Sequence, residues 1–324
     1  MTIDAEKSMV VKRIDPHVDL RINGDRLDVW KIGSVRSFSF PDAEKISKDF
    51  AARFHAGVLT PDDEMFDSPF TAFLQEQGVV YTIPKDLVDS PEEELFLTVN
   101  RLVSIADISS RLKKNSVLVV GDCTMTDDIL SNLDDLGVNA SREDPDSELG
   151  MFENVDLVVV VTKSLLDPHV QKINDFLLEN ERHIVWLPVF HQLGNSVLVG
   201  PFIHPHKTAC LECLRLRLTS TIGEIPDWYV NPGAPLMEYG DRFINRETPL
   251  EKLACNLVAQ MIQNKLALCE YSGLSRPGFL QQLSVDNKGF HSVAHRVLKA
   301  PRCESCSESS RLGYPQVWHH GALS

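Results

Sequence analysis

The fold of this chain is indicated most directly by the apolar stretch SVLVVG at residues 116–121. Four consecutive apolar residues between a serine and a glycine are typical of a short strand that is buried on both faces. A helical pattern follows through Ile129, Leu133 and Leu136 and ends at Gly137. A buried strand followed by a helix is the repeating unit of a parallel sheet that helices cover on both faces.

The same alternation continues along the chain. Extended segments are predicted at residues 138–141, at VDLVVVV (155–161) and at HIVWLPV (183–189), with a helix over 170–180 between the last two. One helix is expected from Leu95 to Leu112, before the first strand, and another after the capping box that begins at Thr248. We therefore predict an α/β fold in which residues 86–324 form a doubly wound, parallel-sheet domain.

The first 85 residues have a different pattern and are predicted to form a separate small domain. Alternating segments at 18–22, 27–32 and 35–40 are joined by turn residues and predict a three-stranded meander. Three helices are expected next: one ending at Gly57, a short one near 61–66, and one from the cap Ser68 to Gly78. A strand at 79–83 completes what we interpret as a winged-helix module.

The composition and the charge of the chain argue against some classes of protein. The chain has 324 residues, 43% of them hydrophobic, and a net charge of −14. The acidic balance argues against a general nucleic-acid binder, which would carry a basic face. No apolar run approaches the ~20 residues that span a bilayer, and the N-terminus lacks a signal-peptide pattern, so a cytoplasmic protein without a membrane partner is expected.

Two widely separated Cys-x-x-Cys pairs predict a metal site. Cys210, Cys213, Cys303 and Cys306 could supply four thiolates to one tetrahedral ion, and structural zinc fits this ligand set. Disulfides or independent redox pairs are the alternatives, although nothing in the sequence suggests an oxidising compartment. Nearby histidines at 204 and 206 could each replace a cysteine. A closed four-cysteine site has no open position for water and would do no hydrolysis.

The other three cysteines, Cys123, Cys255 and Cys269, have no paired spacing. We expect them to be small buried residues rather than nucleophiles.

The order of a buried strand, Gly121, a helix and a second strand, followed by Gly200-Pro201 and both cysteine pairs, resembles the ThiF/MoeB family of adenylating enzymes, although the turn GDCTMTD (121–127) departs from that family's pattern. That resemblance implies ATP bound at a glycine-rich turn, but here Cys123 and Met125 stand where phosphate needs space. Lys163 occupies the place where adenylating members carry a magnesium-binding aspartate. Glu143 and Asp144 lie about where a ribose-binding acid would sit, and we interpret them as solvated surface. We therefore expect a degenerate domain that has no catalytic residues and binds no ATP.

The predicted module at the N-terminus resembles the PqqD-like element that recognises leader peptides of ribosomally made, modified peptides. In that family the leader adds as a strand to the third strand and packs against the third helix. The resemblance implies a groove formed by Val35, Arg36, Ser37, Phe38, Ser39, Phe40, Phe70, Phe73, Leu74 and Gln77. A winged-helix DNA-binding regulator with a zinc-stapled domain is the alternative, and the acidic balance counts against it.

The segment GPFIHPHKTACLECL (200–214) is similar to partner proteins of azole-forming peptide cyclodehydratases, which include McbB-like proteins. The resemblance implies a subunit that binds the precursor leader peptide and holds structural zinc, while a YcaO-type enzyme uses ATP to form azolines at Cys, Ser or Thr. An FMN-dependent dehydrogenase is a further candidate partner, and a homo- or hetero-oligomer is expected. The alternative is an active adenylating enzyme that acts on a peptide or sulfur-carrier C-terminus.

Overall fold

The computed structural model divides the chain into two compact units, Met1–Ile105 and Ala106–Ser324. Within them it describes residues 10–23, 25–31, 33–39, 48–50, 53, 57–99, 101–147, 152, 154–162, 165, 167–180, 183–192, 196–220, 248–269, 272–301 and 303–307.

The predicted meander of the first unit is confirmed. Strands β2 (Val18–Asn23), β3 (Arg26–Lys31) and β4 (Ser34–Ser39) form an antiparallel sheet in this order. Leu27 lies opposite Phe38, and both side chains belong to one hydrophobic core cluster. The alternation along β3 therefore buries one face and leaves the other to solvent.

A second sheet of this unit, in the order β5-β1-β6, was only partly foreseen. The predicted closing strand is β6 (Val80–Pro84), and it pairs antiparallel with β1 (Val10–Ile14), which in turn pairs with β5 (Val58–Leu59). The segment VVKRI of β1 has no apolar alternation that would predict a strand. The fold accommodates its Lys12 because the ammonium donates a hydrogen bond to the carbonyl oxygen of Phe66 at 2.6 Å. Because the charged side chains of β1 find partners only in the folded chain, the hydrophobic pattern of the sequence did not predict this strand.

The helices of this unit agree with the prediction in part. Helix α2 (Pro69–Glu76) begins as expected at Ser68, whose hydroxyl accepts a hydrogen bond from the N–H of Thr71. The short helix expected near 61–66 is a series of turns instead. The carboxylate of Asp63 accepts a hydrogen bond from the N–H of Met65 at 2.9 Å, an arrangement that competes with helix formation.

The single helix expected from Leu95 to Leu112 is two helices, α3 (Pro91–Thr98) and α4 (Ile105–Lys114). The break contains Arg101, which has a left-handed backbone with φ of 63°. Its guanidinium donates to Asp15 at 3.1 Å and to the carbonyl oxygen of Gly78 at 3.0 Å. These tertiary contacts hold Arg101 in a conformation that no helix can continue through.

The first unit extends past residue 85, where the sequence suggested its end. Glu93 of α3 accepts hydrogen bonds from Arg13 of β1 at 2.7 Å and from the hydroxyl of Tyr81 of β6. The short helix η2 (Lys85–Leu87) connects β6 to α3. Because α3 is bonded to the β5-β1-β6 sheet in this way, it belongs to the same compact unit.

The second unit contains a seven-stranded sheet in the order β13-β12-β11-β10-β9-β7-β8. The predicted parallel part is β7 (Val117–Val120), β8 (Ala140–Glu143), β9 (Leu157–Thr162) and β10 (Val185–Gln192). The sheet is mixed rather than wholly parallel, because β11 (Ser196–Val199), β12 (Phe279–Asp286) and β13 (Gly289–Arg296) extend it antiparallel. These three strands were not predicted.

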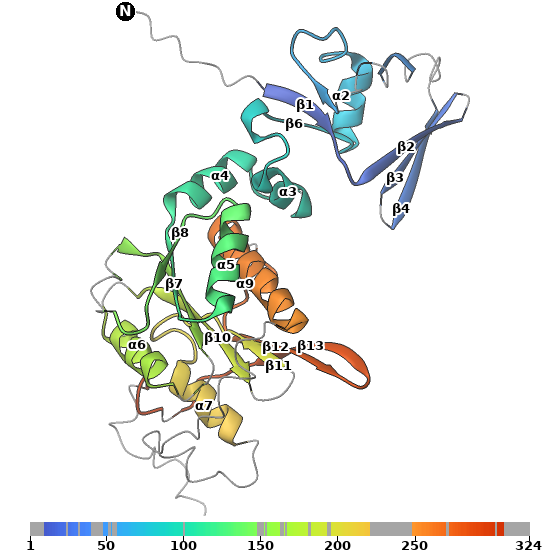
Figure 1. Cartoon of the computed structure of the whole chain (residues 1–324). Helices are drawn as coiled ribbons and strands as arrows, with labels where there is room; N and C mark the ends of the chain where they lie inside the picture. Colours follow the sequence, from blue (N-terminus) through green and yellow to red (C-terminus); the bar gives the residue numbers. More distant parts are fainter. Residues whose placement is uncertain are drawn as a thin grey trace, which may run out of the picture. The chain divides into compact units, whose positions relative to one another are not determined.

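Helices cover both faces of this sheet (Figure 1). Helix α5 (Thr124–Asp135) lies beside the long helix α9 (Pro249–Leu268), and α6 (Pro168–Glu179) and α7 (Leu211–Thr219) cover the opposite face. The predicted capping box at the start of α9 is present, with reciprocal bonds between Thr248 and Glu251. In the part of the chain that the structure describes, no helix combines the length and apolar character needed to cross a membrane.

Candidate metal centre and peptide-binding groove

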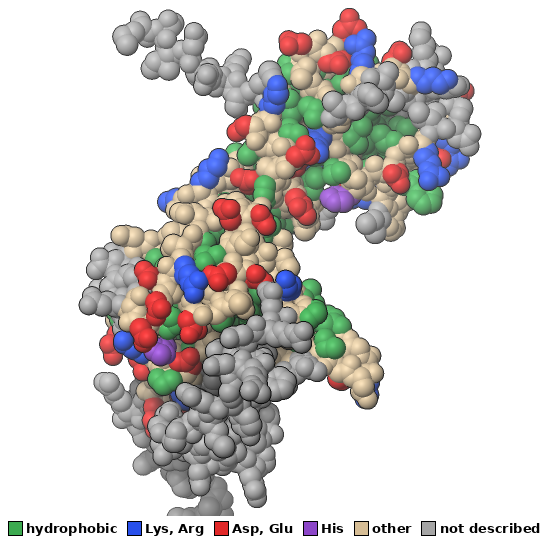
Figure 2. Space-filling model, in the orientation of Figure 1, with side chains coloured by type: hydrophobic (Ala, Val, Ile, Leu, Met, Phe, Trp, Pro, Cys, Tyr) green, Lys and Arg blue, Asp and Glu red, His purple; other side chains and the backbone are tan. Residues whose placement is uncertain are grey.

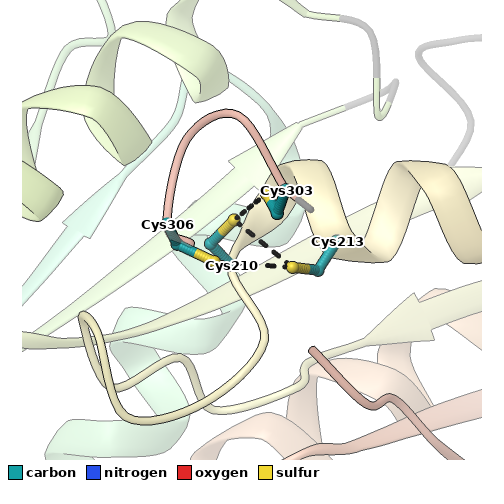
Figure 3. Close-up of side chains that lie close together, drawn as sticks. All are labelled: Cys210, Cys213, Cys303 and Cys306. Atoms are coloured by element: carbon teal, nitrogen blue, oxygen red, sulfur yellow. Dashed lines mark hydrogen bonds between the residues drawn. The ribbon is translucent and has the colours of Figure 1, made fainter. Parts of the chain in front are cut away.

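The four predicted metal ligands meet in the hydrophobic core of the second unit. The sulfur atoms of Cys210, Cys213, Cys303 and Cys306 all lie within 4.8 Å of one another, and all four residues are buried (Figure 3). Individual sulfur separations are 3.8 Å for Cys210–Cys213 and 3.5 Å for both Cys210–Cys303 and Cys213–Cys306.

These separations fit one metal ion better than disulfides. A disulfide requires sulfur atoms about 2.05 Å apart, and all four cysteines are free. Four sulfurs about 2.3 Å from a central ion would lie about 3.8 Å from one another in a regular tetrahedron. The observed cluster has the size of such a tetrahedron, so the site could hold a metal ion.

The local fold directs one sulfur toward the ionised form that a metal requires. Hydrogen bonds from the thiols of Cys210 and Cys306 lower the pKa of Cys213 far below its ordinary value. The backbone N–H of Ala300 donates to the Cys213 sulfur at 3.3 Å. Thiolate sulfurs held by backbone amides are the usual ligands of structural metal sites.

A buried asparagine, which the sequence gave no reason to select, positions the first cysteine pair. Asn174 of α6 is fully buried, and its side-chain oxygen accepts a hydrogen bond from the N–H of Leu211 at 3.1 Å. Leu211 begins α7 directly after Cys210, whose own side chain makes no capping bond. Asn174 therefore supplies the cap of α7 from another helix and leaves the Cys210 sulfur to the cluster.

The two histidines that could have replaced a cysteine have other surroundings. His206 bonds the carbonyl oxygen of Leu178 through Nε2 at 2.7 Å. His204 has a buried Nε2 without a hydrogen-bond partner, and neither histidine belongs to the metal-ligand cluster found among the described residues. Of the three unpaired cysteines, Cys255 is buried as expected, Cys123 is half-buried, and Cys269 is exposed, contrary to the prediction.

The residues of the predicted peptide groove fall into two groups. Phe38 and Phe73 are half-buried and contact each other edge to face with ring centroids 5.1 Å apart, and Gln77 is half-buried at the end of α2. Phe70 and Leu74 are only 8% and 0% exposed, because α2 turns them into the core. Their side chains therefore pack in the hydrophobic core of this unit and offer little or no surface to a peptide.

The strand of the predicted groove is one of the two outer strands of its sheet. β4 pairs with β3 and has no second neighbour within the described part of the sheet. Arg36 lies on the same face as Phe38, whereas Val35, Ser37 and Ser39 lie on the opposite face. Phe40 lies outside the described residues. Figure 2 shows hydrophobic side chains at the surface between the region of α2 and the β2–β4 sheet.

A third location is the crevice at the carboxyl ends of β7 and β9, where the strand order reverses and where doubly wound folds bind nucleotides. A Cβ atom at Gly121 would overlap Oγ1 of Thr126 in α5 and would lie 3.0 Å from the carbonyl oxygen of Val161, so this glycine allows the end of β7 to pack closely against both α5 and β9. Met125 is 4% exposed at the start of α5.

Arg142, the basic residue of this acidic region, is paired with Asp127. Lys163 lies outside the described residues.

A network of interactions around His169 lies at the same carboxyl ends of the strands. Nε2 of His169, at the start of α6, lies 2.8 Å from Asp146, which follows β8. Nδ1 of His169 lies 2.9 Å from Asp167, and Asp167 also accepts a hydrogen bond from Thr162 at the end of β9. Because β8 and β9 flank β7, this network passes over the carboxyl end of β7. The sequence signal for it was the cap-and-proline pair Asp167-Pro168 that begins α6.

A comparison with solved structures finds several chains with a similar fold. The structure of the heterocyclase TruD matches with a TM-score of 0.63 at 16% identity, over 92% of this chain and 43% of that chain. A heterocyclase in complex with substrate and cofactor matches at 0.61 and 17% identity, over 93% and 40%. The microcin C7 biosynthetic enzyme MccB in complex with N-formylated MccA matches at 0.54 and 12% identity, over 92% and 100%.

This chain has the fold of those enzymes. It spans less than half the length of the heterocyclase chains that it matches. No protein-family model matches the sequence, and no curated protein is similar to it. At these identities the likeness concerns the fold, so the activity, substrates and partners of this chain have to be argued from its own residues.

Proposed function

We propose that this chain is a leader-peptide-binding scaffold subunit that delivers a ribosomal precursor peptide to a YcaO-type, ATP-dependent cyclodehydratase for azoline formation. In this proposal the chain itself performs no chemistry. An FMN-dependent dehydrogenase could join the same complex and oxidise the rings.

The observation that carries the proposal is the outer edge of β4, which pairs with no other strand among the described residues, beside the Phe38–Phe73 contact. An extended peptide that adds to such an edge gains backbone hydrogen bonds, and adjacent pockets select its side chains. Phe38, Phe73 and Gln77 provide an apolar surface with a polar end, and Arg36 extends the same face of the strand. A leader peptide with one or two apolar side chains and an acidic neighbour fits this surface.

The metal centre and the crevice support a non-catalytic role. We infer that the four cysteines hold zinc, since four thiolates in a closed tetrahedron are typical of structural zinc. A site of this kind has no open coordination position. Thr126 and Val161 pack directly against Gly121, Met125 is buried, and the surrounding acidic residues oppose a polyanion.

The fold comparison is consistent with this division of labour. The heterocyclase chains include a region of this fold and continue well beyond it. MccB, in its complex with N-formylated MccA, has the same fold over its whole length. The proposal assigns peptide binding to the region that this chain represents and assigns ATP-dependent cyclisation to a partner enzyme.

Titration of the full-length protein with a fluorescently labelled candidate leader peptide tests the groove. Phe38→Asp and Arg36→Glu alter the face of β4 that meets α2, and each should weaken binding by about tenfold or more. Thr82→Glu is the control, because Thr82 is exposed on β6, in the other sheet of this unit and outside the predicted groove, and its replacement should leave the affinity unchanged. A folded Phe38→Asp protein that binds the leader as tightly as the wild type would refute the groove.

Two further measurements separate the alternatives. ATP–pyrophosphate exchange by the isolated protein at enzymatic turnover, abolished by mutation of Glu143, would favour an active adenylating enzyme instead. Salt-sensitive, sequence-selective binding to duplex DNA would favour a winged-helix regulator. Leader-dependent stimulation of a YcaO-type enzyme, with neither of these activities, is the expected result.

A further inference from the structure

A cavity of about 690 Å³ lies in the second unit, at the end of α9 and along the loop that leads to β12. Its lining includes Lys265, Cys269, Ser272, Ser275 and Arg276. A cavity of this volume lies within the ordinary range for small-molecule sites. None of its lining residues belongs to the thiolate cluster, the groove or the nucleotide crevice.

The cavity lies near the amino ends of the parallel strands, whereas the nucleotide crevice of doubly wound folds is at their carboxyl ends. The ammonium of Lys265 lies 6.0 Å from the ring centre of Phe202, and the next residue, Ile203, pairs with Trp186 at the beginning of β10. Arg111, near the end of α4 and just before β7, donates to the carbonyl oxygen of Ala267 at 2.7 Å. Both contacts place the end of α9 at the amino ends of the parallel strands, whereas the nucleotide crevice is at their carboxyl ends.

Among the described lining residues, the two charged ones, Lys265 and Arg276, are both cationic. Burial lowers the pKa of Lys265, and no carboxylate in the described part of the chain forms an ion pair with it or with Arg276. A half-buried ammonium that no described carboxylate pairs with is unfavourable unless a ligand, solvent or another group compensates it. The whole chain has a net charge of −14, so a cavity lined by two cations differs in sign from the overall electrostatic potential of the protein.

Two buried serines add a hydrogen-bond donor. Ser272 is 9% exposed and Ser275 is 2% exposed, and their hydroxyl oxygens lie 2.5 Å apart. The Ser272 oxygen also accepts a hydrogen bond from the N–H of Ser275 at 3.0 Å. Whichever hydroxyl donates within the pair, one hydroxyl proton remains for an outside acceptor.

We propose that this cavity binds a small organic oxyanion, a carboxylate or a phosphate ester, through Lys265, Arg276 and the Ser272–Ser275 pair. An ammonium, a guanidinium and a spare hydroxyl proton are all donors, so the complementary ligand is rich in acceptors and negatively charged. The site would act in addition to the proposed peptide groove and does not depend on it.

The competing explanation is that Lys265 only complements the negative end of the α9 dipole. The two explanations differ in what a ligand does. A dipole role changes the stability of the protein without any anion, whereas a binding site makes the melting temperature depend on the concentration of a particular anion.

Thermal unfolding of the full-length protein, with inorganic phosphate or succinate titrated at constant ionic strength against sodium chloride, tests the site. A saturable rise in melting temperature with either anion is expected. Lys265→Met and Arg276→Gln should each weaken the response about tenfold or more, since each removes a charged hydrogen bond. Ser275→Ala should weaken it less. Lys288→Met, in the exposed turn between β12 and β13, is the matched control and should respond like the wild type.

Each result of this experiment decides for or against the cavity. A response to phosphate alone, to succinate alone or to both identifies the ligand group and supports the site. Arg276 is exposed, so its variant remains informative if Lys265→Met does not fold. No saturable response to either anion in the wild type, or equal responses in the wild type and both cation variants, would overturn the proposal.

Discussion

The sulfur atoms of Cys210 and Cys303 lie 3.5 Å apart, although 93 positions separate the two residues in the sequence. Cys210 precedes α7, and Cys303 follows the last strand of the sheet. A metal ion at this point would join two distant segments of the second unit and would connect them through its hydrophobic core. Metal binding should therefore be coupled to the folding of the whole unit.

We expect one zinc ion per chain, and we expect Cys303→Ser to prevent cooperative folding of the second unit. Structural zinc supplies on the order of 10 kcal/mol in small sites, so loss of one ligand should exceed the stability that most domains possess. Elemental analysis of the purified protein, combined with thermal unfolding before and after chelation, measures both effects.

Cys269→Ser is the matched control, because Cys269 is exposed and lies outside the cluster. It should bind the same amount of zinc as the wild type. A protein that keeps its full stability after exhaustive chelation would contradict a structural role for the metal.

Substitutions at neighbouring positions of α2 should separate stability from peptide binding. Leu74→Ala removes a fully buried side chain and should lower the free energy of unfolding by about 2–5 kcal/mol. It should leave the leader affinity of the folded protein unchanged. Phe73→Ala, at a half-buried position of the groove, should weaken leader binding more than it lowers stability.

Urea unfolding and leader titration of the same two proteins make this comparison. The groove would be wrongly placed if Leu74→Ala weakened leader binding more than Phe73→Ala under conditions where both are folded.

His204 should make the protein less stable in mild acid. Burial, with smaller effects from Lys265 and Lys207, lowers the pKa of His204 to about 4. The unfolded chain, with an ordinary pKa near 6.5, then binds a proton that the folded chain does not bind. Stability is therefore fully present above about pH 6.5 and falls as the pH decreases toward 4, by on the order of 3 kcal/mol at most.

Denaturant unfolding between pH 4 and 7.5 measures this slope, and His204→Gln should reduce it. His295→Gln, at an exposed position of β13, is the control and should keep the wild-type slope. Identical slopes in the wild type and His204→Gln would rule out His204 as the source.

His169 should have the opposite pH dependence. Burial opposes its charge, but hydrogen bonds and attraction to Asp146 and Asp167 outweigh burial and raise the pKa of His169. A raised pKa means that the ion pairs stabilise the fold at low pH, and that this contribution is lost as the pH rises through the pKa of the folded state. The titration of the His169 ring, followed by NMR, should have its midpoint above the ordinary value, and Asp146→Asn should move it down.

Asp286 is the acid partner of another half-buried histidine, His291, in the hairpin of β12 and β13. Asp286→Asn therefore provides the control, and it should leave the His169 midpoint in place. An unshifted midpoint for His169 in the wild type would show that the network over β7 does not form in solution.

Local patterns along the chain determined several elements correctly. The apolar run 116–121 and the run 155–161 became β7 and β9, because strands buried on both faces need side chains that can be buried on both faces. Ser68 and Thr248 began α2 and α9 as expected, because a cap is satisfied by residues within one helical turn. The four cysteines were identified as one site from their spacing, and they do lie together.

Only the tertiary structure decided the features that depend on distant partners. Arg101 broke the expected helix because Asp15 and Gly78 hold its side chain, and β1 formed although its sequence is charged. Phe70 and Leu74 were expected to line a peptide groove and are buried in the core, since the orientation of α2 against the core cannot be read from its helical spacing alone. Many elements and the four candidate metal ligands could be predicted from the sequence, because they follow from local chemistry. The exposed face beside β4, the cavity at the end of α9 and the position of the four-cysteine cluster in the core follow from contacts between residues far apart in the chain, and these exist only after folding.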